Sequence, residues 1–237
     1  MSFAPERLNR LPVAERGITI GDFLVPIAVG ERLSARTRHI ALVVTGAVLI
    51  ALTANLQLVL AGQTIILPGD VRVTLPTSPV PITAQTFSVL LVGGALGFRR
   101  GVLAVALYLV VGLFLPVYAG SNSGVDTYIG LDGGRWVLGA TGGYLLGFLV
   151  AGAVVGRLAE LGWDRHVGGA VVAMLVGNLA IYLVGIPWLM AATGFGVGTA
   201  IDKGLAPFVF GDLLKLALAG IAFPVAWWVV GRRTGER

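Results

Sequence analysis

Apolar residues fill long stretches of the chain from residue 39 onward, and short polar segments separate these stretches. A helix needs about 20 residues to cross the hydrocarbon core of a bilayer. The pattern therefore predicts six transmembrane helices, with a tight turn at residues 99–101 between the second and the third. The predicted spans lie at roughly 39–61, 83–98, 101–119, 137–157, 167–192 and 205–231.

The composition also favours a membrane protein. Of the 237 residues, 56% are hydrophobic and only 12% are charged, and the mean hydropathy is +0.89. Soluble domains carry about 25% charged residues, so we expect an all-α integral membrane protein. The chain has no cysteine and two histidines far apart in sequence, so we expect no disulfide, no metal and no cofactor. Its basic residues are scattered, which argues against a nucleic-acid partner.

The distribution of basic residues predicts the orientation of the spans. Thirteen of the 17 Lys and Arg residues fall on one side of the six predicted spans, three fall on the other side, and Lys215 lies within a span. Because basic residues favour the cytoplasmic side, we expect both termini in the cytoplasm and a multi-pass protein of the cell (inner) membrane. We divide the chain into a cytoplasmic N-terminal segment, 1–38, and a six-helix substrate-binding membrane domain, 39–232.

Two long loops lie on the predicted outer side. The first, 61–87, contains four prolines and many apolar residues, which favours a stiff lid lying on the helix ends, with a surface hairpin as the alternative. The second, 115–144, is rich in Gly, Ser, Asn and Asp, which allows the backbone to approach a ligand closely. Within it, Asn122 offers both a donor and an acceptor. Arg135 could hold an anion or, beside Trp136, anchor the chain at the membrane interface.

Small residues recur every four positions in the fourth predicted span. Gly143, Gly147 and Ala151 have this spacing, which lets helices pack closely in lipid, so we assign these residues a packing role. Thr141 and Tyr144 lie near the outer end of the same span. They could line a cavity there, although a tyrosine at that depth is also common at membrane interfaces.

Asp212 and Lys215 stand within the last apolar stretch. A charge at mid-membrane costs about 2.5–3.5 kcal/mol on insertion scales, so two such charges require an explanation. At a spacing of three residues they share one helix face and can pair. They could form a structural ion pair or a proton relay. The reading that we favour is a ligand site for a small, partly apolar molecule with an amide-like or urea-like head, because Asp accepts from N–H groups and Lys donates to oxygen.

Three blocks of sequence occur in the order PVPITAQTFSVLLVGGALGFRRGVLAVALYLVVGLFLPVYAG, GATGGYLLGF and APFVFGDLLK. Together they resemble the BioY family, the biotin-binding S components of energy-coupling factor (ECF) transporters, and the resemblance covers roughly residues 41–225. PVPIT, TGGY and GDxxK are specific in combination, whereas each alone is weak. The resemblance implies six helices, biotin bound near the outer face under the loop that joins the first two spans, and no enzyme activity.

The resemblance also implies roles for individual residues. Asp212 is expected to accept from the ureido N–H groups of biotin and Lys215 to donate to biotin. Arg135 is the candidate for the valerate carboxylate. The further candidate substrate-binding residues are Asn122, Tyr144, Thr141 and Gln85.

The implied partners are a transmembrane coupling protein and two cytoplasmic ATPase subunits. The family docks through small residues of its first helix, which here are Ala47 and Ala51; their spacing alone favours packing inside the bundle. The chain contains no GxxxxGK[ST] phosphate-binding loop, so any step driven by ATP needs a separate protein. The alternatives are binding of another vitamin, such as thiamine or riboflavin, and a proton- or ion-coupled secondary carrier.

The chain departs from the family pattern in four places. Its N-terminal segment is long, both outer loops are enlarged, and Ala140 stands where proline is expected before TGGY. None of these departures touches GDxxK, so the expected class of substrate is unchanged. A larger lid could alter access to the site.

Overall fold

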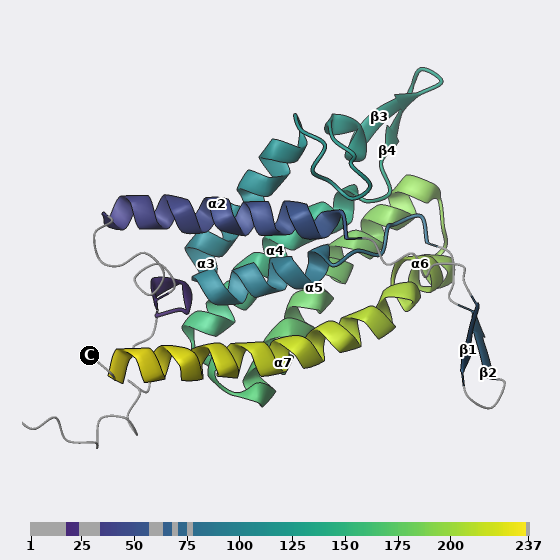
Figure 1. The fold of residues 1–237 in the computed structure, drawn as a ribbon. Helices are drawn as coiled ribbons and strands as arrows, with labels where there is room; N and C mark the ends of the chain where they lie inside the picture. The colour runs from purple at the N-terminus through teal and green to yellow at the C-terminus, as the bar shows by residue number, and fades with distance from the viewer. Residues whose placement is uncertain (1–17, 24–33, 57–63, 68–70, 75–77, 236–237) are drawn as a thin grey trace, which may run out of the picture.

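The computed structural model describes residues 18–23, 34–56, 64–67, 71–74 and 78–235. Within these residues, five helices are long and apolar enough to cross a membrane. They are α2 (Ala35–Ala54), α3 (Gln85–Gly112), α4 (Gly142–Glu160), α5 (Val167–Thr193) and α7 (Ala206–Gly235). Figure 1 shows them as one bundle, in which α2 begins and α7 ends at the same end. We call the opposite end of the bundle the outer end.

Helix α3 contains two spans that fold back on each other. Its backbone is non-helical at Gly97, where φ is 80° and ψ is 179°. Nε2 of Gln85 donates a 2.7 Å hydrogen bond to the hydroxyl of Tyr108, although 23 residues of straight helix would separate them by about 35 Å. Segments 85–96 and 98–112 therefore cross the bundle separately, and the predicted count of six spans is confirmed.

The sequence predicts the turn between these two spans at residues 99–101, whereas in the structure the turn lies at Gly97. A φ of 80° is readily adopted by glycine, which has no Cβ. Arg100 instead belongs to the next helical segment, where its side chain pairs with Asp22 at 2.6 Å. Gly101 serves close packing, because a Cβ added to it would stand only 3.0 Å from Cα of Gly93.

Three of the spans also begin or end at other positions than the sequence predicted. The first span is α2, which begins at Ala35 and ends at Ala54 and not at residue 61. The third span ends at Gly112 and not at residue 119, and Pro116, four residues further on, is a residue that disfavours continuation of a helix. The fourth span begins at Gly142 and not at residue 137, because Arg135–Leu138 forms strand β4.

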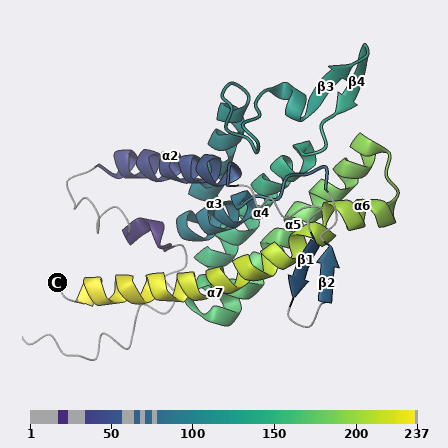
Figure 2. The ribbon, with the colours of Figure 1, turned by 45° about the vertical axis from the view of Figure 1, so that its right-hand side comes forward.

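Two antiparallel hairpins lie outside the bundle (Figure 1). Strand β1 (Thr64–Leu67) pairs with β2 (Val71–Thr74), and β3 (Ile129–Asp132) pairs with β4. The first hairpin is the alternative that the sequence left open for the first outer loop, whereas the favoured interpretation was a lid. The end of that loop, from Pro79 to Thr83, lines a cavity at the outer end of the bundle. Figure 2 shows α2 and α7 on opposite sides of the bundle, with the short helix α6 (Val197–Gly204) beside the start of α7.

Helix α4 packs against both α3 and α5 through its glycines. A Cβ on Gly156 would stand 2.6 Å from the carbonyl carbon of Gly97, and one on Gly147 would stand 2.9 Å from the carbonyl oxygen of Ile181. Contacts this short to backbone atoms leave no room for a larger residue. The predicted packing role of the small residues in this span is confirmed.

Candidate functional site

A cavity of about 390 Å³ opens among the outer ends of the helices. Its wall is formed by parts of segments 79–86, 118–127 and 139–148, by α5 and by Phe208 of α7. Pockets for small molecules typically measure about 300–1,000 Å³. The cavity is therefore large enough for a vitamin-sized ligand.

Three aromatic side chains form one side of this cavity. The rings of Tyr144, Tyr182 and Phe208 lie in mutual contact, with centroids 6.3–6.4 Å apart. Tyr144 stacks on Phe208, and its hydroxyl is already used, because it donates a 2.8 Å hydrogen bond to the carbonyl of Gly204. These rings offer a ligand a mainly apolar surface.

Two buried amides supply polar groups to the same cavity. Asn178 of α5 is 6% exposed and lines the cavity, and its side chain makes no hydrogen bond within the described part of the chain. Gln85 is 4% exposed; its Nε2 donates to Tyr108, and its Oε1 accepts no hydrogen bond from the described residues. A buried polar group normally has a partner. Asn178 therefore has a donor and an acceptor available to a bound molecule.

The buried ion pair lies directly behind the cavity wall. Nζ of Lys215 is 3.1 Å from Oδ1 of Asp212, and the two residues are 8% and 7% exposed. The hydroxyl of Tyr182 donates to Oδ2 of Asp212, and Nζ of Lys215 donates a 2.6 Å hydrogen bond to Oγ1 of Thr86. Tyr182 and Thr86 both line the cavity, so each charge is one side chain away from a ligand.

A tyrosine network holds the second outer loop against α3. The hydroxyl of Tyr118 donates a 2.6 Å hydrogen bond to the carbonyl of Leu109 and lies 2.9 Å from the hydroxyl of Tyr128. Burial raises the pKa of both tyrosines above its ordinary value. An unperturbed tyrosine is already neutral at physiological pH, so both hydroxyls keep the protons with which they can donate hydrogen bonds.

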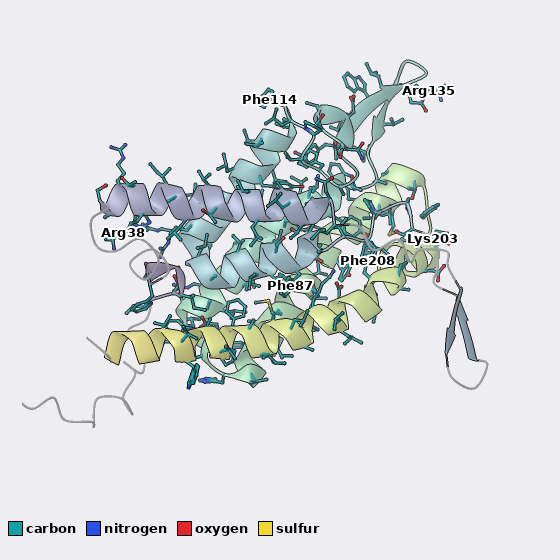
Figure 3. The ribbon with its side chains drawn as sticks, viewed as in Figure 1. Arg38, Phe87, Phe114, Arg135, Lys203 and Phe208 are labelled. Atoms are coloured by element: carbon teal, nitrogen blue, oxygen red, sulfur yellow. The ribbon has the colours of Figure 1, made fainter. Side chains whose placement is uncertain are left out.

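The structure places the predicted substrate-binding residues in three positions. Four of them line the cavity. Asp212 and Lys215 lie one layer behind it. Arg135 is exposed on β4 at the tip of its hairpin, away from the cavity (Figure 3). The four lining residues are Gln85, Asn122, Thr141 and Tyr144.

The two alanines proposed for docking lie on α2. Ala47 is buried in the core of the bundle, and Ala51 is half-buried. The exposed face of α2 carries bulky side chains, among them Val44, Val48 and Leu52. These positions match the internal-packing interpretation, and docking through this pair stays a prediction.

Most of the cavity lining was not predicted from the sequence, and three of the polar residues among those missed matter for the site: Thr86, Asn178 and Tyr182. Asn178 carried a usable signal, because an amide inside a long apolar helix needs a hydrogen-bonding partner that lipid cannot supply. Tyr182 follows it by four residues and so shares its helix face. Thr86 had no comparable signal, since a threonine near a helix start is common.

The model of the BioY family matches residues 56–232. "Biotin transporter BioY" of Thermotoga maritima is 34% identical over 171 residues, which cover 70% of this chain and 92% of that protein. "Probable biotin transporter BioY" of Pyrococcus horikoshii is 34% identical over 151 residues, which cover 63% of this chain and 82% of that protein.

The fold is similar to that of a solved structure, the crystal structure at 2.1 Å of the S-component for biotin from an ECF-type ABC transporter. The two folds match with a TM-score of 0.61 and 22% sequence identity, over 86% of this chain and 95% of the other.

Proposed function

Since this chain belongs to the BioY family, we propose that it is a membrane-embedded subunit that binds biotin for uptake into the cell. Its relatives are named as biotin transporters, and its fold matches that of a biotin S-component. The observation that carries the proposal is the outer cavity, which buried amides and an aromatic cluster line together. This combination suits a molecule with a polar head and an apolar body.

The groups of biotin can be assigned to residues that line the cavity. Its ureido head has two N–H donors and one carbonyl acceptor, and the amide of Asn178 and Oε1 of Gln85 can pair with them. The sulfur-containing ring would lie against the aromatic side formed by Tyr144, Tyr182 and Phe208. The cavity-lining residues that the structure describes include no Lys or Arg. We therefore assign the valerate carboxylate to Asn122 and Thr141; contact with Arg135 would require its hairpin to fold over the opening.

Asp212 and Lys215 influence this site indirectly, through two side chains of the cavity wall. They hold Tyr182 and Thr86 by hydrogen bonds, and so fix two side chains that a ligand touches. Direct contact with biotin, which the family resemblance implies, requires one of those two side chains to move aside. Direct contact and positioning predict different effects of substituting Asp212 and Tyr182.

The proposed setting is the cell (inner) membrane, with both termini in the cytoplasm. The proposed partners are a transmembrane coupling protein and two ATPase subunits, because nothing in this chain resembles a phosphate-binding loop. The segment 1–38 would lie on the cytoplasmic side of the membrane domain, 39–232.

Calorimetry on the purified protein in detergent tests the proposal. We expect saturable binding of one biotin per chain and no binding of thiamine or riboflavin under the same conditions. Binding of either of those vitamins without binding of biotin would contradict the proposed substrate. Uptake of biotin into proteoliposomes that follows a pH gradient, with no ATPase present, would favour a secondary carrier instead.

A further inference from the structure

The hairpin of β3 and β4 has one apolar face and one mixed face. Leu131 pairs directly with Trp136, and Asp132 pairs with Arg135. Because side chains alternate along a strand, one face carries Ile129, Leu131, Trp136 and Leu138. The other face carries Gly130, Asp132, Arg135 and Val137.

The apolar face is open to its surroundings. Trp136 is 74% exposed and Leu131 is 63% exposed, and they are cross-strand neighbours near the tip. Exposed apolar patches usually mark a surface that contacts a partner or a membrane. Two large apolar side chains exposed side by side on such a short hairpin, with strands of four residues, therefore require an explanation.

The base of the hairpin lies at the outer ends of the spans. Just before the hairpin, the backbone N–H of Gly124 donates to the carbonyl of Gly112, the last residue of α3, at 2.9 Å. Just after it, the carbonyl of Gly139 accepts from Nε1 of Trp188 on α5 at 2.8 Å. Strands of four residues extend about 14 Å, and the polar interface of a bilayer is about 5–8 Å deep on each side. A hairpin that leaves the bundle obliquely therefore stays near the interface.

Figures 1 and 3 show that the hairpin does leave the bundle obliquely. In Figure 3 the tip residue Arg135 lies on the side away from the helices, and Phe114 lies on the side toward them. Since Trp136 and Leu131 occupy the face opposite Arg135, the apolar face is turned toward the side of Phe114. Phe114 is 79% exposed and continues the lipid-facing surface of α3.

We propose that this apolar face rests on the outer-leaflet interface of the membrane, with Trp136 and Leu131 among the lipid chains and Arg135 among the headgroups. Indole rings and arginines favour this depth, and the face is turned toward the side on which the exposed Phe114 lies. The inference is separate from the proposed function, because it does not depend on the ligand. It gives the enlarged second outer loop a role as an anchor beside the cavity.

Site-directed spin labelling tests this proposal, and the absence of cysteine from the chain makes single labels possible. A nitroxide is attached to Leu131→Cys on the apolar face or, as the matched control, to Val137→Cys on the opposite face of the same hairpin. Each protein is reconstituted into liposomes of phosphatidylcholine and phosphatidylglycerol. Collision with oxygen, which partitions into lipid, is compared with collision with a water-soluble nickel complex.

We expect the label at Leu131 to favour oxygen over nickel at least threefold more strongly than the label at Val137. Equal access of nickel to both labels would overturn the proposal, because the face would then be in water. A Leu131 label shielded from both reagents would also overturn it, since a protein partner or a second copy would then cover the face. Biotin binding by both labelled proteins, measured in parallel, reports that the cavity is intact and keeps this test separate from that of the proposed function.

Discussion

Lys215 donates a 2.6 Å hydrogen bond from Nζ to Oγ1 of Thr86, which joins α7 to the first residues of α3 across 129 positions of sequence. Thr86 lines the cavity and Lys215 does not. The same ammonium pairs with Asp212, which in turn accepts from Tyr182. Two cavity side chains are thus held by a single buried ion pair.

Replacing the carboxylate should weaken biotin binding. We expect Asp212→Asn to raise the Kd for biotin more than tenfold, which corresponds to about 1.4 kcal/mol or more, while the protein still folds and inserts. The reason is that the neutral amide holds neither Lys215 nor Tyr182 as the carboxylate does. Calorimetry measures the change, and Asp202→Asn, an exposed carboxylate on α6, is the matched control. Near-normal affinity in Asp212→Asn would count against this role.

A second substitution separates direct contact from positioning. Tyr182→Phe removes only the hydroxyl that donates to Asp212. If Asp212 acts through Tyr182, each single variant should lose a similar amount of affinity, and the double variant should lose little more than either. If Asp212 contacts biotin itself, the losses should be unequal and should add. A double-mutant cycle on biotin affinity distinguishes the two results.

Asn178 should matter for binding and not for folding. Its amide makes no hydrogen bond within the described part of the chain, so Asn178→Leu should not lower the unfolding temperature of the ligand-free protein. Affinity for biotin should fall about tenfold, as expected when a hydrogen bond to the ligand is lost and its partner stays buried. Leu179→Ala, on the exposed side of the same helix, serves as the control. A lower unfolding temperature with unchanged affinity would assign Asn178 a structural role.

Close packing of α4 on α3 predicts a large effect of one methyl group. A Cβ at Gly156 would stand 2.6 Å from two backbone atoms, the carbonyl carbon of Gly97 and the nitrogen of Phe98. Because backbone atoms cannot rotate away, we expect Gly156→Ala to destabilise the protein by about 1–3 kcal/mol. Gly168→Ala on α5, where the added methyl group meets nothing within 4 Å, should be neutral or slightly stabilising. Thermal unfolding in detergent compares the two, and equal unfolding temperatures would contradict the packing argument.

The buried carboxyl of Asp164 should make the stability of the folded protein depend on pH. This carboxyl lies in the turn between α4 and α5, and burial raises its pKa to about 6, although its hydrogen bond from Trp227 and the neighbouring Arg165 and His166 favour the charged form. The folded protein therefore holds this proton more tightly than the unfolded chain does. The resulting stabilisation is fully present below pH 4 and is lost as the pH rises through about 6.

The matching variant is Asp164→Asn, which keeps an oxygen to accept from Trp227 but does not titrate. The unfolding temperature of the unaltered protein should fall, relative to that of the variant, between pH 4 and pH 7. If the unfolding temperatures of the two proteins change with pH in parallel, Asp164 does not contribute to the pH dependence of stability.

The sequence alone determined which segments enter the membrane. Six apolar stretches were found, because the transfer of a segment into lipid depends mainly on its own composition. Asp212 and Lys215 could be identified as candidate site residues because a charge inside lipid is costly. The spacing of small residues predicted close packing of α4. The outer end of this helix also supplied Thr141 and Tyr144 to the cavity wall.

Only the tertiary structure decided how these elements face one another. In the structure the turn between the second and third spans lies at Gly97, and Asn178 lines the cavity. Arg135 lies on a hairpin outside the cavity, and the Asp212–Lys215 ion pair lies behind the cavity wall. Hydropathy is a property of each segment, whereas the direction in which a side chain points within the bundle depends on contacts between segments far apart in sequence. In a helix that is apolar on every side, periodicity carries no signal for which face looks inward, so packing against neighbours has to choose it.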